Sequence, residues 1–296
     1  MKKKAAVFIL LGQSNAVGHN LPMEPEDVID RPMKNVFGLA RTDNQSFDTT
    51  ELVWSGYTSF GMNLGEEQDN TYSVANCLAA DWQAHIDSGN AANLPDLYIV
   101  QIAIGAQGTM EGMMWYPRRE PKLIPGKLGT ADISLFPFSM HILSLLEESL
   151  RERGLEPDII GLHWRGGEND TGRPAEELTA RLPGIYREII GSFNRVLSQP
   201  PITLHRLAIG DRMLDVDPTG EKGRLKRLDF VNGVFEQMRE EYPNVSTFDV
   251  RNAPQYDPDV WGSGLFQSDL LHFTAPVNRW VAEQILEEYV RRKTVG

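Results

Sequence analysis

The sequence predicts an α/β fold, namely a three-layer α/β/α sandwich with a parallel sheet of about five strands. Short apolar runs typical of buried strands alternate along the chain with segments whose apolar residues recur every three or four positions, as in amphipathic helices. Strands that alternate with helices form a parallel sheet through right-handed crossovers. The expected strands are residues 5–11, 97–104, 158–164, 202–209 and 245–250.

The first expected strand is an unbroken apolar run that includes the β-branched residues Val7 and Ile9. In the helix expected over 178–196, Pro183 and Gly184 are expected to kink or divide the helix. The remaining expected helices cover residues 72–88, 141–153, 225–238 and 274–290.

One domain is expected over residues 1–296, because no low-complexity linker and no internal repeat divides the chain. Two stretches rich in polar residues, glycine and proline are expected to be long irregular insertions, at about 19–70 and 110–138. The first should contain short strands around Val36 and Val53. Insertions of this length are usually functional or mobile, and we expect both over the active edge of the sheet.

The composition, 41% hydrophobic and 24% charged residues, is that of an ordinary globular protein. A formal net charge of −12 disfavours nucleic acid and anionic membranes as partners. The only cysteine, Cys77, excludes an intramolecular disulfide. Lysines 2–4 precede an apolar run as in a signal peptide, but the run is short and no small-residue cleavage site follows. No apolar run reaches transmembrane length. The compartment is therefore expected to be the cytoplasm or is left open, and the sequence does not indicate the oligomeric state.

Three expected strands end in polar loops that contain glycine, at residues 12–19, 105–109 and 165–172. In a parallel sheet all three loops emerge at the carboxyl edge, where open α/β sheets bind their ligands. Ser14 lies in the first loop, where free backbone N–H groups at a helix start favour developing negative charge, so Ser14 is a candidate nucleophile. The alternatives are that Ser14 only caps the helix, or that this loop binds phosphate.

Asp269 and His272 stand three residues apart, just before the last expected helix. At this spacing the carboxylate can hold the imidazole in one tautomer and leave its other nitrogen free to act as a base toward a hydroxyl. The alternative is a turn aspartate beside a histidine that caps the helix or satisfies a core hydrogen bond. His19 is close enough to Ser14 to line a pocket. The histidines show no metal-binding spacing such as H-E-x-x-H.

Four sequence blocks together resemble the SGNH hydrolase superfamily. Residues 12–18 (G-Q-S-N-A-V-G) are similar to the first block of carbohydrate esterase family 6 and the sialate O-acetylesterase group, and residues 269–272 (D-L-L-H) to the last block. Residues 104–109 (I-G-A-Q-G-T) are similar to the G-G-[ST] block, and residues 164–170 (W-R-G-G-E-N-D) to the W-x-Q-G-E-x-D block. The resemblance spans nearly the whole chain and implies a flavodoxin-like fold.

The resemblance also implies a mechanism. Ser14 attacks an acetyl carbonyl, His272 is the general base and Asp269 orients it, while the backbone N–H groups of Ser14 and Gly108 receive the oxyanion. No metal or organic cofactor is required. Residues of the same blocks are expected to hold the loops together or to bind substrate, namely Gln13, Asn15, Arg165, Glu168 and Asp170.

The chain departs from the family pattern at two points. Gly166 stands where the family has a glutamine, so a side-chain donor commonly placed near the oxyanion is missing, and Arg165 or the amides of Gly166 and Gly167 are the candidates to replace it. The G-G-[ST] block carries extra residues, so Gly105 and Gly108 compete for the oxyanion role. We favour Gly108, because Thr109 follows it as in the family's block.

The function implied is that of a serine esterase that removes O-acetyl groups from carbohydrate, of the acetylxylan or the sialic-acid type. A lipid or thioester hydrolase on the same fold is one alternative, and a carbohydrate-binding protein without catalysis is another. A flavodoxin-like nucleotide binder is a third, but it would leave Asp269 and His272 without a role.

Overall fold

The computed structural model describes residues 3–41, 47–66, 69–89, 94–122, 133–208 and 221–295. These residues contain a seven-stranded sheet in the order β3-β2-β4-β1-β5-β6-β7. Strand β3 is antiparallel to β2, and the other neighbouring strands are parallel. The strands are β1 (Lys3–Gly12), β2 (Val36–Leu39), β3 (Trp54–Gly56), β4 (Asp96–Ala103), β5 (Leu155–Arg165), β6 (Ile202–His205) and β7 (Val245–Phe248).

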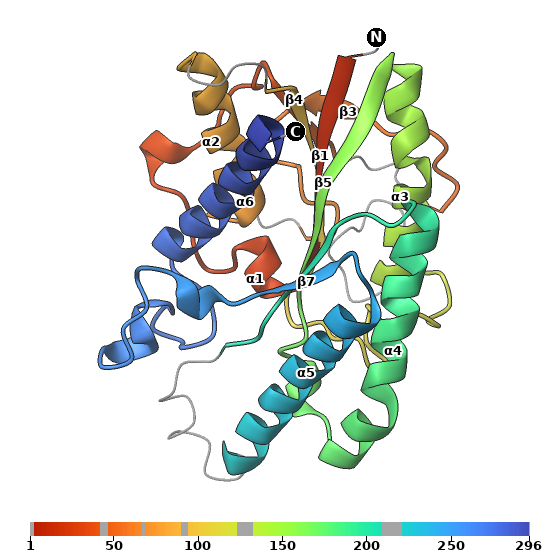
Figure 1. Ribbon diagram of the computed structural model, residues 1–296, viewed down its shortest axis with the longest axis vertical. Coiled ribbons are helices and arrows are strands. Elements are labelled where there is room, and N and C mark those ends of the chain that lie inside the picture. Colours follow the sequence, from red (N-terminus) through yellow and green to blue (C-terminus); the bar gives the residue numbers. More distant parts are fainter. Residues whose placement is uncertain are drawn as a thin grey trace.

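Helices cover both faces of the sheet and complete three layers (Figure 1). Helices α2 and α6 pack together on one face, and α3, α4 and α5 lie on the other. The helices are α1 (Ser14–Val17), α2 (Val74–Asp87), α3 (Leu135–Glu152), α4 (Ala175–Val196), α5 (Glu221–Glu241) and α6 (Ala275–Val295). The expected α/β/α sandwich is confirmed.

The central strand β1 shows why the chain forms two cores. Its side chains alternate, so that Val7 and Ile9 are buried under one helical layer while Ala6 and Phe8 are buried under the other. A strand buried on both faces reads as a continuous apolar run, which is the pattern in the sequence. Because both cores share this sheet, we propose that residues 1–296 form one domain.

All five expected strands are present as β1, β4, β5, β6 and β7, and their spatial order is the flavodoxin-like one. Strands β2 and β3, the short strands expected around Val36 and Val53 in the first insertion, extend the parallel sheet of about five strands beyond β4. These two strands are short, and edge pairing rather than a clear apolar pattern defines them. Residue 209 of the fourth expected strand, and residues 42–46, 67–68 and 123–132 of the two insertions, lie outside the described residues.

Two helix expectations need correction. Of the kink or division expected at Pro183, the division is absent, because α4 is continuous and its apolar residues on both sides of the proline, such as Leu182 and Ile185, are buried in the same core. Helix α3 begins at Leu135, earlier than expected, with Pro137 in its first turn. Proline is tolerated in the first turn because its missing N–H would have no partner within the helix there.

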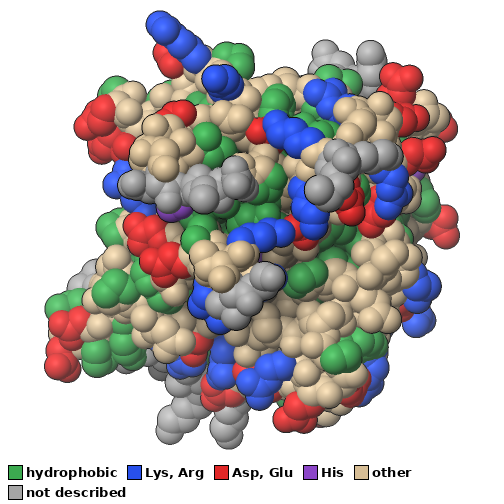
Figure 2. Space-filling model, turned by 45° about the horizontal axis from the view of Figure 1, so that its top comes forward, with side chains coloured by type: hydrophobic (Ala, Val, Ile, Leu, Met, Phe, Trp, Pro, Cys, Tyr) green, Lys and Arg blue, Asp and Glu red, His purple; other side chains and the backbone are tan. Residues whose placement is uncertain are grey.

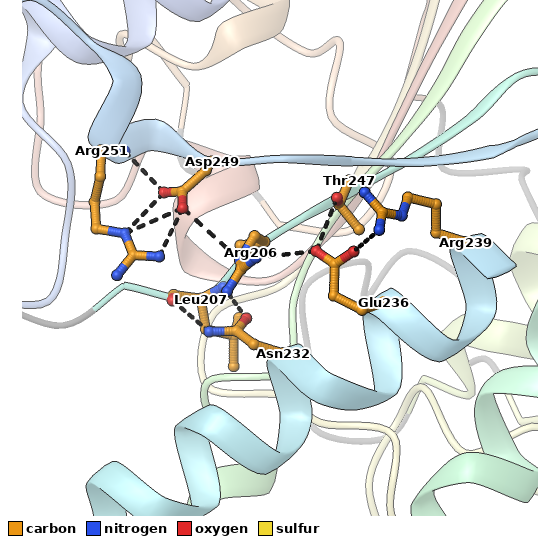
Figure 3. A network of polar contacts seen from close by, with 8 residues as sticks. All are labelled: Arg206, Leu207, Asn232, Glu236, Arg239, Thr247, Asp249 and Arg251. Atoms are coloured by element: carbon orange, nitrogen blue, oxygen red, sulfur yellow. Dashed lines mark hydrogen bonds and ion pairs between the residues drawn. The ribbon is translucent and has the colours of Figure 1, made fainter.

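A polar network lies where β6 and β7 end, next to α5 (Figure 3). Asn232 on α5 accepts from the Leu207 N–H over 2.7 Å and donates to the Leu207 carbonyl over 3.0 Å. Beside it, Arg206 donates to Glu236 over 3.0 Å, and Glu236 also accepts from Thr247 at the end of β7. The network therefore ties the ends of β6 and β7 to α5.

On the face seen in Figure 2, basic and acidic side chains are interspersed rather than gathered into one patch. None of the helices in the described parts of the chain is both long and apolar enough to cross a bilayer.

Candidate active site

Ser14 lies directly after β1, at the start of α1. Strand β1 ends at Gly12, whose φ is +148°, and a side chain there would overlap the carbonyl oxygen of Arg165 on β5. Glycine therefore lets the two strand ends approach closely, and the Gln13 N–H donates to the same carbonyl over 2.9 Å. The N-cap of α1 is Gln13 and has no side-chain cap, so the capping role considered for Ser14 is not observed.

The Asp269 carboxylate organises the turn that precedes α6. Its Oδ1 accepts from the N–H groups of Leu271 and His272, each over 3.0 Å, and its Oδ2 lies 2.6 Å from His272 Nδ1. Burial acts to raise the pKa of Asp269, but the hydrogen bonds from His272 and Leu271 outweigh it and lower that pKa. An ionised Asp269 accepts a hydrogen bond from the Nδ1–H group of His272, which leaves Nε2 as the basic nitrogen.

Asn15 connects α1 to this turn across the chain. Its side-chain nitrogen donates to the Leu271 carbonyl over 3.3 Å, and its oxygen accepts from the Phe273 N–H over 3.2 Å. Asn15 therefore binds the residues on both sides of His272. Its nitrogen also donates to Glu168 over 2.9 Å, so three of the sequence blocks meet at one side chain.

Ser14 and His272 lie in the same region but are not hydrogen bonded to each other. Ser14 is 5% exposed. Within the described part of the chain, neither the Ser14 hydroxyl nor the Nε2 atom of His272 has a hydrogen-bond partner. In enzymes without substrate, such hydrogen bonds are often long and shorten only in the reacting complex.

Asp170, after β5, holds the loop that follows β4. It accepts from the N–H and the hydroxyl of Thr109, each over 2.9 Å, and from the Met110 N–H over 3.3 Å. Burial raises the pKa of Asp170 to about 6, although these hydrogen bonds act in the opposite direction. Gly108 packs so closely against this carboxylate that a side chain at Gly108 would overlap it.

The glycines considered for the oxyanion role differ in whether their amide groups are available. The Gly105 N–H donates to Glu66 Oε2 over 2.7 Å. The N–H groups of Gly108, Gly166 and Gly167 have no acceptor among the residues that the structure describes. This difference favours Gly108 over Gly105.

Arg165 points into the protein. It is 2% exposed, donates to Asn278 on α6 over 2.8 Å, and its guanidinium lies 5.0 Å from the ring centre of Phe273. Burial lowers its pKa to about 10, although the nearby Glu168 carboxylate acts to raise it. This position favours support of the residue next to His272 over direct contact with a sugar. Gln13 is equally buried, at 2% exposure.

Two further side chains lie at this site. The ring centroids of His19 and His272 are 5.2 Å apart, so His19 lies beside the Asp–His pair. Glu66, which binds the Gly105 N–H, was not among the candidates. It comes from the first irregular insertion, which carries no periodic or motif signal that would have singled it out.

Among the described residues, no group of three or more histidine, cysteine, aspartate or glutamate side chains is placed to hold a metal ion.

The fold has relatives among solved structures. NanS superposes with a TM-score of 0.62 at 16% identity, over 97% of this chain and 98% of that one. A protein from Arabidopsis thaliana has a TM-score of 0.58 at 17% identity, over 97% and 98% of the two chains. A weaker match, with a TM-score of 0.43 at 11% identity over 96% and 99%, is Est24, a carbohydrate acetylesterase from Sinorhizobium meliloti.

Identities this low establish a shared fold and nothing finer. The α/β fold implied by the SGNH hydrolase resemblance is confirmed. No protein-family model and no curated protein matches the sequence.

Proposed function

We propose that this protein is a serine esterase that removes O-acetyl groups from carbohydrate. The observation that carries the proposal is the Asn15 side chain, which follows Ser14 and binds the chain on both sides of His272. In addition, the contact of Asp269 with Nδ1 holds His272, the proposed base, in one orientation. A nucleophile, a base and an orienting carboxylate are the parts that acyl transfer needs.

In the proposed reaction, Ser14 Oγ attacks the acetyl carbonyl carbon and its proton passes to His272 Nε2. Asp269 stabilises the imidazolium, and the N–H groups of Ser14 and Gly108 donate to the oxyanion, each worth about 3 kcal/mol in comparable sites. The alkoxide of the sugar leaves with the proton from His272, and an acetyl-enzyme remains. Water, deprotonated by His272, then releases acetate and restores Ser14.

The remaining residues of the blocks position these groups. Asn15 and Glu168 hold the His272 turn against α1, and Asp170 holds the loop that carries Gly108. No metal or organic cofactor enters this reaction, because the serine supplies the nucleophile and the imidazole supplies the base.

The test is acetate release from p-nitrophenyl acetate, acetylated xylan and O-acetylated sialic acid by the wild type and by Ser14→Ala. We expect kcat to fall by about 10³-fold or more in Ser14→Ala on every ester that the wild type cleaves. Ser144→Ala, at an exposed serine of α3, is the control and should match the wild type. Equal rates in wild type and Ser14→Ala, or no hydrolysis of any ester, would contradict the proposal.

The same assay separates the alternatives. Faster hydrolysis of long-chain acyl esters or thioesters than of acetyl esters would indicate a lipid or thioester hydrolase. Binding of acetylated sugar without turnover would indicate a carbohydrate-binding protein.

A further inference from the structure

A carboxylate and an imidazole that the proposed reaction does not use meet at Gly105, the second residue after β4. Glu66 Oε2 accepts from the Gly105 N–H over 2.7 Å. A Cβ atom added to Gly105 would lie 2.9 Å from His19 Nδ1 and 3.4 Å from Glu66 Oε2. Both side chains therefore lie against the same glycine, although they come from opposite ends of the first insertion.

His19 is held against the proposed catalytic turn. Its carbonyl accepts from Gln267 Nε2 over 3.1 Å, and the same nitrogen donates to the Phe273 carbonyl over 3.0 Å. The ring centroids of His19 and His272 lie 5.2 Å apart, with the ring planes tilted by 40°. The carboxylate and imidazole pair thus borders the base that would act on the ester.

Neither group is fully satisfied by the protein. His19 Nδ1 is buried and has no hydrogen-bond partner among the described residues. Glu66 forms no ion pair with a described residue, because the neighbouring Arg41 binds the Glu66 carbonyl but pairs with the carboxylate of Asp69. Polar atoms left open beside a reaction centre are the ones for which a ligand or water supplies the partner.

We propose that Glu66 and His19 form the subsite for the alcohol portion of the ester, and that they select uncharged sugars over sugars that carry a carboxylate. A carboxylate accepts hydrogen bonds from sugar hydroxyls, and an imidazole can both donate and accept. A sugar acid bound at the same place would bring a second carboxylate next to Glu66, and like charges at close range oppose binding. The proposal rests on the proposed esterase function and narrows its substrate class.

The experiment compares kcat/KM for an O-acetylated neutral sugar, acetylated xylose, and for an O-acetylated sugar acid, O-acetyl-N-acetylneuraminic acid. The wild type should prefer acetylated xylose by about tenfold or more, and Glu66→Gln should reduce this preference by about tenfold. A glutamine oxygen can still accept from the Gly105 N–H, so the loop keeps its anchor. The ratio between the two substrates cancels any general loss of activity in the variant.

A second variant and a control complete the test. His19→Gln should lower kcat/KM for acetylated xylose more than for p-nitrophenyl acetate, which has no hydroxyl groups on its alcohol portion. Glu148→Gln, at an exposed glutamate near the C-terminal end of α3, is the control and should have the same kcat/KM ratio as the wild type. A preference of the wild type for the sugar acid, or a ratio unchanged in Glu66→Gln, would overturn the subsite while leaving the esterase proposal intact. No ester hydrolysis by the wild type would overturn both.

Discussion

At the scale of single residues, the candidate site is held by side chains that bind backbone groups on distant segments. Asp269 accepts two backbone N–H groups in addition to His272 Nδ1, and Asp170 accepts two from the 105–110 loop in addition to the Thr109 hydroxyl. Each carboxylate therefore both holds a loop by hydrogen bonds and places a negative charge beside it. Most substitutions at such residues change the loop geometry and the charge together, so an informative variant changes the charge and keeps the hydrogen bonds.

Asp269→Asn is such a variant. The amide oxygen can still accept the N–H groups of Leu271 and His272, but the charge that holds the Nδ1 proton of His272 is lost. We expect kcat for acetyl esters to fall by about 10²–10⁴-fold with little change in melting temperature. Steady-state kinetics and thermal unfolding measure the two quantities. Wild-type kcat in Asp269→Asn would exclude the proposed role of Asp269.

Gly108→Ala tests the loop that carries the proposed oxyanion donor. The added methyl group would overlap the Asp170 carboxylate, so the loop must shift. We expect a loss of about 1–3 kcal/mol in the free energy of unfolding, as for other overpacked sites, and a fall in kcat of about 10²-fold. Gly191→Ala, where the nearest atom to the new methyl is the end of the Arg195 side chain at 3.6 Å, is the matched control. An active, fully stable Gly108→Ala would contradict this assignment.

At the scale of elements, the ends of the parallel strands are joined by side chains rather than by further strands. Asn15, Asp170 and Arg165 link segments after β1, β4 and β5 to each other and to α6. At the other side of the sheet, the network of Figure 3 does the same for β6, β7 and α5. The loops at the carboxyl edge of the sheet are therefore held together by hydrogen bonds from a few side chains.

Asn232→Ala tests one of these side chains. Asn232 is 4% exposed and, among the described residues, provides the partner for both the N–H and the carbonyl of Leu207. Its removal leaves a buried N–H and a buried carbonyl without partners, so we expect about 2–4 kcal/mol less free energy of unfolding. Chemical denaturation measures this change. Arg239→Ala, at a half-exposed ion pair on the same helix, should cost under about 1 kcal/mol, and an equal effect of the two variants would contradict the argument.

At the scale of the whole molecule, two buried histidines couple stability to pH. His163 Nδ1 and His205 Nε2 lie 2.9 Å apart inside the sheet region. Burial, together with the charge of Arg165, lowers the pKa of His163 to about 3 and places that of His205 well below its usual value. Both imidazoles are therefore neutral in the folded protein at pH values where the unfolded chain binds protons.

The sign of the effect follows from this difference. As the pH falls below about 6.5, the unfolded chain gains a proton at each histidine while the folded protein does not, so the free energy of unfolding decreases, by up to about 1.4 kcal/mol per pH unit for each. Chemical denaturation at several pH values should show that the free energy of unfolding decreases as the pH falls. The slope of this free energy against pH should be shallower in His163→Gln than in the wild type. His85→Gln, at a partly exposed position of α2, should leave the slope unchanged. Equal slopes in wild type and His163→Gln would exclude a buried, neutral His163.

The sequence by itself determined the parts that depend on neighbours in the chain. The apolar run of β1, the glycine turn after it and the three-residue spacing of Asp269 and His272 are local, because strand pattern, turn geometry and one-turn contacts act over a few residues. The alternation of strands and helices predicted a parallel sheet with right-handed crossovers. The flavodoxin-like order of its strands was implied by the resemblance to SGNH hydrolases.

Only the tertiary structure decided which loops touch. The contacts of Asn15 with Leu271 and Phe273 span 256 and 258 residues, and the inward direction of Arg165 depends on Asn278 in the last helix. Glu66 lies in an irregular segment whose path is set by long-range contacts such as that of Arg41 with its carbonyl. Such contacts leave no periodic trace in the sequence, because hydrogen bonds between distant loops depend on where the whole sheet places them.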